Sequence, residues 1–88
     1  MKESHIILGV HITERTRQAV LVQQILTAHG GIIKTRLGLH EPQGENGSPN
    51  GLLLLEVTGG VARADALAAD LGALEGVQVK RMVFEHPD

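Results

Sequence analysis

The stretch that decides the fold is Gly51–Gly59, GLLLLEVTG. Because side chains alternate along a strand, its apolar residues would divide between two faces, with Leu53, Leu55 and Val57 on one and Leu52 and Leu54 on the other. A strand with one wet face alternates apolar and polar residues, whereas this run is apolar on both faces. Its short length and bracketing glycines favour a strand over a helix. The sequence therefore predicts a central strand that needs cover on both sides.

Three more strands and two helices are predicted around this segment. The strands span 5–12, Ile32–His40 and Val77–Phe84, the helices span about Arg15–His29 and Val61–Ala73, and a turn-rich loop spans Glu41–Asn50. The order βαββαβ is that of the ferredoxin-like fold. We therefore expect one α+β domain over residues 1–88, with both helices on one face of an antiparallel four-stranded sheet. Its expected strand order is fourth, first, third, second, which puts the leucine-rich strand inside the sheet.

Helical and strand periodicities predict which residues cover the core. On the first helix the expected stripe is Ala19, Val22, Ile25, Leu26 and His29, widened by Leu21 and Ala28. On the second helix it is Ala64, Leu67, Ala68, Leu71 and Leu74. On the second strand, Ile33, Thr35, Leu37 and Leu39 are expected to face the helices, with Lys34, Arg36 and His40 pointing away.

The composition narrows the function classes. The chain has 88 residues, a formal net charge of −2, no cysteine and one aromatic residue, Phe84. The absence of cysteine excludes disulfides, thiolate metal sites and a cysteine nucleophile within this chain. The weak negative charge gives no drive toward nucleic acid or anionic membrane. With no long apolar segment near its start, the chain is expected to be cytoplasmic.

The face of the sheet without helices is predicted to be too apolar to remain in water. Its expected apolar residues are Ile7, Leu52, Leu54, Met82 and Phe84. Such a patch usually marks an interface, and a second copy of the same chain is the simplest partner. We therefore expect a homo-oligomer, a dimer or a tetramer, that associates through these five residues.

Two segments resemble a known family. The segment 31–39, GIIKTRLGL, resembles the second-strand signature of the regulator family of the iron-only hydrogenase system. The segment 71–80, LGALEGVQVK, resembles that family's LG-x-L-x-GV-x-VK segment and is the more specific of the two. The resemblance spans nearly the whole chain. It departs from the family at 40–42, His-Glu-Pro, where relatives tend to carry an aromatic residue and a proline.

The resemblance implies an ACT-like domain, similar to the C-terminal domain of nickel-responsive regulators. Such domains associate through their sheets or edges, and they sense small ligands or dock on regulatory or maturation proteins. Ligands of ACT-like domains lie at interfaces near the loop that leads into the first helix. The residues that the resemblance assigns to ligand contacts are His11, Thr13 and Gly38.

No catalytic residue, metal site or cofactor is predicted. Of the five histidines, His5 and His86 are the best-placed pair, and His29 ends a helix, where the dipole favours it. Neither a close-spaced histidine motif nor a nucleophile beside a base is present. Direct nucleic-acid binding is disfavoured because the sheet lacks stacking aromatics. The alternative to a non-enzymatic regulatory module is a small dimeric ferredoxin-like enzyme with a cavity on the sheet face, lined by His11.

Overall fold

The computed structural model describes residues 5–13, 15–39 and 51–85. The predicted loop 41–50, together with His40 and His86, lies outside the described residues. The strands are β1 (His5–Ile12), β2 (Ile33–Leu39), β3 (Gly51–Val57) and β4 (Val77–Phe84). The helices are α1 (Arg15–Ala28) and α2 (Val61–Gly72), and a short 3-10 turn, η1 (Gly30–Ile32), leads into β2.

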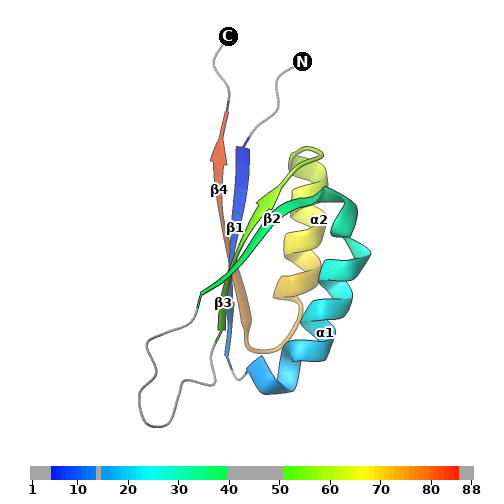
Figure 1. Cartoon of the computed structure of the whole chain (residues 1–88), viewed down its shortest axis with the longest axis vertical. Helices are drawn as coiled ribbons and strands as arrows, with labels where there is room; N and C mark the ends of the chain where they lie inside the picture. Colours follow the sequence, from blue (N-terminus) through cyan, green and yellow to red (C-terminus); the bar gives the residue numbers. More distant parts are fainter. Residues whose placement is uncertain (1–4, 14, 40–50, 86–88) are drawn as a thin grey trace.

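The four strands form one sheet in the order β2-β3-β1-β4, and every neighbouring pair is antiparallel. Both helices lie on the same face of this sheet, as Figure 1 shows. The predicted βαββαβ fold, the strand order and the inner position of the leucine-rich strand are therefore confirmed. The basic pairs Lys34/Arg36 and Lys80/Arg81 fall on the two edge strands, where charge discourages further pairing.

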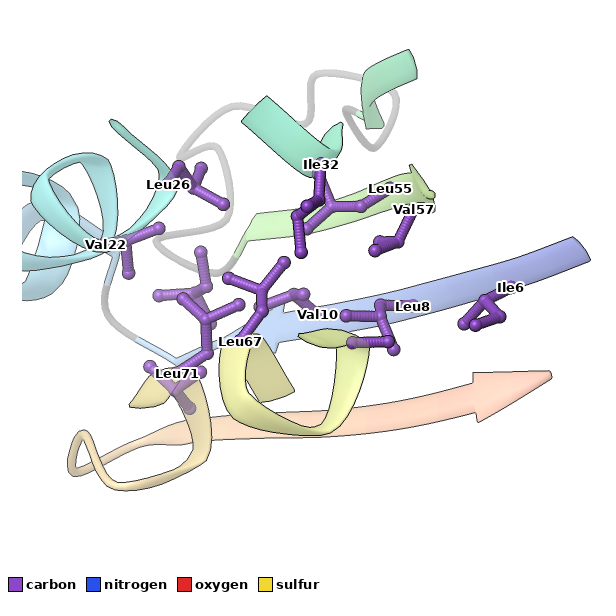
Figure 2. Packing of buried hydrophobic residues seen from close by; sticks show 13 residues of the cluster. Ile6, Leu8, Val10, Val22, Leu26, Ile32, Leu55, Val57, Leu67 and Leu71 are labelled. Atoms are coloured by element: carbon purple, nitrogen blue, oxygen red, sulfur yellow. The ribbon is translucent and has the colours of Figure 1, made fainter. Parts of the chain in front are cut away.

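The core lies between the sheet and the helices and is built from aliphatic side chains alone (Figure 2). Every second residue of β1, from Ile6 to Ile12, is buried, as are Leu55 and Val57 of β3. From α2, Leu67 and Leu71 reach the sheet with no exposed surface. Leu53 is partly buried against the same cluster, so the predicted division of the β3 side chains between two faces is confirmed.

Fewer residues of the first helix are buried than its sequence pattern predicts. Val22 and Leu26 are buried and Ile25 packs beside the core, as predicted. Three other members of the predicted stripe, Ala19, Leu21 and Ala28, are exposed. The cause is geometric, because a helix lying on a sheet beside a second helix buries only the positions on its line of contact. The second helix follows its prediction, with Ala64, Leu67 and Leu71 buried and Ala68 and Leu74 partly so.

The predicted orientation of β2 is wrong beyond its first residue. Ile33 pairs with Val57 and packs against the core, but the register shifts between Ile33 and Thr35. A bulge adds one unpaired residue and reverses the faces of those that follow. Thr35 and Leu37 consequently pair with Glu56 and Leu54 on the helix-free face. Arg36 pairs with Leu55, so it lies on the helix-bearing face instead of pointing away from it.

The turn between α2 and β4 joins directly to the end of β1. Gly76 has φ +79°, a conformation that residues with a side chain rarely adopt. Its carbonyl accepts a hydrogen bond from the Thr13 backbone N–H at 2.8 Å. A Cβ added at Gly76 would lie 3.3 Å from the Thr13 carbonyl oxygen, so both backbone conformation and space require glycine here.

No helix among residues 5–13, 15–39 and 51–85 combines the length and the apolar character needed to cross a membrane.

Leu67→Ala should reduce the free energy of unfolding by about 2–5 kcal/mol, because it removes a side chain with no exposed surface and leaves a cavity. Leu21→Ala is the matched control, since that leucine is 45% exposed on α1, and its effect should stay within about 0.5 kcal/mol. Urea denaturation followed by circular dichroism measures both. Equal losses in the two variants would contradict the packing described here.

Gly76→Ala should be destabilising by about 1–2 kcal/mol, because alanine strains the left-handed backbone and crowds Thr13. Gly72→Ala, at the last residue of α2, should instead be stabilising by up to about 1 kcal/mol, since its Cβ would meet nothing within 4 Å. Thermal unfolding of the two variants beside the parent chain distinguishes them. A stabilising Gly76→Ala would show that the turn is not constrained as described.

Candidate functional surface on the helix-free sheet face

The strand register defines the helix-free face residue by residue, because directly paired residues of antiparallel strands share a face. In the sequence-order of the strands, its members are His5, Ile7, Gly9, His11, Thr35, Leu37, Leu52, Leu54, Glu56, Gln78, Lys80, Met82 and Phe84. The apolar members are spread over all four strands. The face is therefore one continuous surface rather than a few isolated side chains.

This surface exposes large apolar side chains. Phe84 is 57% exposed, Met82 54% and Leu52 38%. Ile7 and Leu54 lie between them, half-buried by their neighbours. All five residues predicted for the oligomer interface thus lie on the helix-free face. What covers the face is a separate question, since the structure holds a single chain.

Leu37 belongs to the same surface and was not predicted to. Its side chain is 51% exposed, and its Cα partner in the neighbouring strand is Leu54. The alternation of the second strand alone assigns it to the core, because the bulge near Lys34 cannot be seen in the spacing of apolar residues.

Glu56 is the only acidic side chain on this face among the described residues, and it has partners within the sheet. The Thr35 hydroxyl donates to Glu56 Oε1 at 3.0 Å, and Lys34 Nζ lies 3.8 Å from Oε2. The Glu56 side chain retains 28% of its surface exposed. The three residues form a small polar cluster at the β2 side of the face, and its carboxylate already has a hydrogen bond and a nearby cation.

Gly9 lies in the middle of this face, on the inner strand β1. The register through Gly9 is continuous on both sides, so the strand has no bulge there. A Cβ added at Gly9 would make only ordinary contacts, 3.8 Å from the Lys80 carbonyl oxygen and 3.9 Å from Leu54 Cδ2. Nothing within the described chain therefore requires glycine at this position. A glycine in mid-strand also permits close approach from outside the sheet.

The three residues assigned to ligand contacts do not share one surface. His11 lies on the helix-free face, paired with Leu52 and Gln78, and Thr13 follows at the end of the same strand. Gly38 pairs with Leu53, on the helix-bearing face, and a Cβ there would touch Leu53 Cδ2 at 3.6 Å. The structure thus brings His11 and Thr13 to one end of β1 and places Gly38 on the opposite face, with β3 between.

The described histidines lie in separate places. His5 and His11 are at opposite ends of β1, and His29 Nε2 lies 2.8 Å from Asp70 Oδ2, which links α1 to α2. Within the part of the chain that the structure describes, no group of three or more histidine, cysteine, aspartate or glutamate side chains is arranged to hold a metal ion. The role of His29 is therefore an inter-helix contact, beyond the helix-end position that the sequence predicts.

Two hollows formed by described residues lie beside the helices. One lies between α2 and β4, and the other runs along Ala19, Val20 and Gln23 on α1. Neither includes His11, which lined the cavity expected for the enzymatic alternative.

Comparisons with known proteins show what the fold resembles. No protein-family model matches the chain, and no curated protein matches it in sequence. Among solved structures, the uncharacterized protein TM1266 from Thermotoga maritima is similar, with a TM-score of 0.77 and 24% identity over 94% of this chain and 98% of that one.

A second group of similar structures is CPII from Thiomonas intermedia, a nitrogen regulatory PII-like protein. The form bound to ADP, AMP and acetate has a TM-score of 0.59 and 8% identity over 100% of this chain and 93% of that one. The form bound to ADP, AMP and bicarbonate has a TM-score of 0.58 and 13% identity, covering 99% and 97%. At these identities the likeness establishes the fold. This chain therefore has a ferredoxin-like fold that PII-like regulatory proteins also adopt.

Proposed function

We propose that this protein is a non-enzymatic, homo-oligomeric ACT-like module that senses a small ligand or docks on a regulatory or maturation protein. The observation that carries the proposal is the exposed apolar surface on the helix-free face, centred on Leu52 and Leu54. The resemblance of segments 31–39 and 71–80 to the iron-only hydrogenase regulators supports a place in that system. The fold shared with PII-like regulatory proteins supports the regulatory class.

Self-association through the helix-free face is the first part of the proposal. Contiguous apolar patches of this kind mark interaction sites, and a two-fold axis lets one patch cover its own copy. Phe84 and Met82 contribute the largest exposed apolar areas, and Leu37 extends the patch to the far edge strand. Each buried square ångström of apolar surface is worth about 25 cal/mol, so covering several half-exposed large side chains yields a substantial driving force.

Two further features suit this face to burial. Because Gly9 has no side chain, a second sheet could approach the backbone closely in the middle of the face. Glu56 would be costly to bury alone, but Thr35 and Lys34 already provide a hydrogen bond and an opposite charge. Covering the face would therefore not leave an unpaired carboxylate.

The second part concerns a ligand. The similar CPII structures hold ADP and AMP, which makes adenine nucleotides the first ligands to test. His11 and Thr13 lie at the end of β1, before the first helix, where the resemblance assigns a ligand. A Cβ at Gly38 would face the other side of the sheet, and β3 lies between Gly38 and His11, so the proposal places the ligand between two chains that together supply these residues. The ligand site and the oligomer are coupled in this proposal.

Leu52→Glu should weaken self-association at least tenfold, because it puts a charge at the centre of the apolar face. Val20→Glu is the matched control, since Val20 is 68% exposed on the outer side of α1, and it should associate like the parent chain. Sedimentation velocity over a range of concentrations gives the dissociation constants. A parent chain that remains monomeric at high concentration would refute the oligomer, as would dissociation caused by Val20→Glu alone.

ADP or AMP should raise the thermal unfolding temperature, because a ligand that binds only the folded state stabilises it by mass action. The gain is about 2.7 kcal/mol when the free ligand is a hundredfold above its dissociation constant. His11→Ala should reduce the shift, while Gln23→Ala on α1 should preserve it. Amino acids, other nucleotides, bicarbonate and divalent metals complete the screen. If no compound produces a saturable shift, the ligand-sensing part of the proposal fails and the docking part stands alone.

A further inference from the structure

The outer edge of β4 and the helix α2 enclose a groove that the proposed function does not use. The groove has a volume of about 570 Å³. Its α2 wall is made of small residues, Ala68, Ala69 and Gly72, with Asp65 at one end. Its other wall is the strand itself, from Val77 to Arg81. Since β4 is an edge strand of the sheet, no other strand among the described residues lies along this wall.

The hydrogen bond at the end of β1 fixes which backbone groups of β4 point outward. In an antiparallel ladder, hydrogen-bonded and non-hydrogen-bonded pairs alternate. The Thr13 N–H donates to the Gly76 carbonyl, so that pair is of the bonded kind and the next pair, Ile12 with Val77, is not. Continuing the register assigns the outward N–H and C=O groups to Val79, Arg81 and Val83.

The same three residues have their side chains on the helix-bearing face. They pair with Val10, Leu8 and Ile6 of the core. A strand that added to this edge would form bonded pairs with them, and its residues in those pairs would share their face. Every second side chain of the added strand would therefore point into the groove beside Ala69 and Gly72. The intervening side chains would lie on the face that carries Lys80.

The charges of β4 argue against a second copy of this strand as the occupant. The outward residues allow two symmetric antiparallel registers with long overlap. One pairs Val79 with Arg81 and sets Lys80 directly against Lys80. The other pairs Val79 with Val83 and sets Arg81 against Arg81. Like charges directly opposite each other are destabilising, and natural edge strands use lysine to prevent such pairing.

We propose that the β4 edge binds an extended acidic segment of a partner protein by strand addition, with small apolar side chains in the α2–β4 groove. Lys80 is exposed and faces the acidic positions of that segment. Arg81 is paired with Asp65 across one end of the groove, so that end is closed and the Arg81 charge is balanced, and Lys80 is the basic group left for the segment. Strand addition supplies affinity through main-chain hydrogen bonds and specificity through alternate side chains. The main-chain edge and the groove lie outside the helix-free face, whereas Lys80 belongs to it, so the acidic side chains of the segment would lie at the border of that face.

The test uses the full chain and a fluorescent peptide of about ten residues in which valine alternates with glutamate, long enough to span the eight residues of β4. Saturable binding is expected, with amide chemical-shift changes at Val79, Arg81 and Val83. Replacing every glutamate of the peptide by lysine should abolish binding. Methylating the valine amides should weaken binding at least tenfold, because these N–H groups face β4, whereas methylating the glutamate amides should not.

Variants of the protein separate the contribution of the groove to peptide binding from the contribution of the Lys80 charge. Ala69→Trp should fill the groove and weaken binding at least tenfold, while Ala62→Trp, exposed at the start of α2 and outside the groove, should leave it unchanged. Lys80→Ala should weaken binding severalfold. The proposal is overturned by absence of saturable binding up to about 1 mM peptide, by equal effects of the two methylation patterns, or by shifts confined to Leu52, Leu54 and Phe84. Cross-links between the β4 strands of two chains would also overturn it.

Discussion

The central strand β3 is apolar on both faces, while the helices of the described part of the chain cover only one of them. On the helix-bearing side, Leu55 and Val57 are buried in the core cluster, together with Ile32 of the η1 turn. On the other side, Leu52 and Leu54 lie among apolar residues from the other three strands and remain partly exposed. A small chain whose only aromatic residue, Phe84, lies on that exposed side has a limited core of its own. Burying the exposed apolar area of the helix-free face by association would add to the stability of this small chain.

Most charged groups lie outside the apolar centre of the helix-free face. Basic residues occupy both edge strands, and exposed polar contacts join His29 to Asp70, Arg81 to Asp65 and Lys34 to Glu56. Such exposed pairs contribute little to stability, up to about 1 kcal/mol each. Basic side chains on the edge strands discourage the edge-to-edge pairing of two sheets. The segment proposed for the β4 edge carries the opposite charge.

Much of the fold could be predicted from the alternation of side chains along β1 and β3 and from the helical spacing of apolar residues in α2. Each of these elements buries one continuous row of apolar side chains in the core. The sequence did not reveal the bulge near Lys34, which moves Thr35 and Leu37 to the helix-free face. A bulge is one extra residue in a register that depends on the partner strand, so the pattern of β2 alone cannot contain it. The stripe on α1 was overestimated for a similar reason, since Leu21 and Ala28 match the periodicity but miss the line of contact.

The candidate site could be predicted only in part. The apolar face followed from the apolar residues on both sides of β3, whereas the contact set of His11, Thr13 and Gly38 rested on resemblance and lies on both faces of the sheet. The central claim is that a second chain covers the helix-free face. It is tested most directly by a soluble paramagnetic probe acting on methyl resonances. We predict that Leu37, Leu52 and Met82 methyls are shielded like those of the buried Leu67, while Val20 is strongly broadened. Broadening of all three to the extent of Val20 would contradict the account.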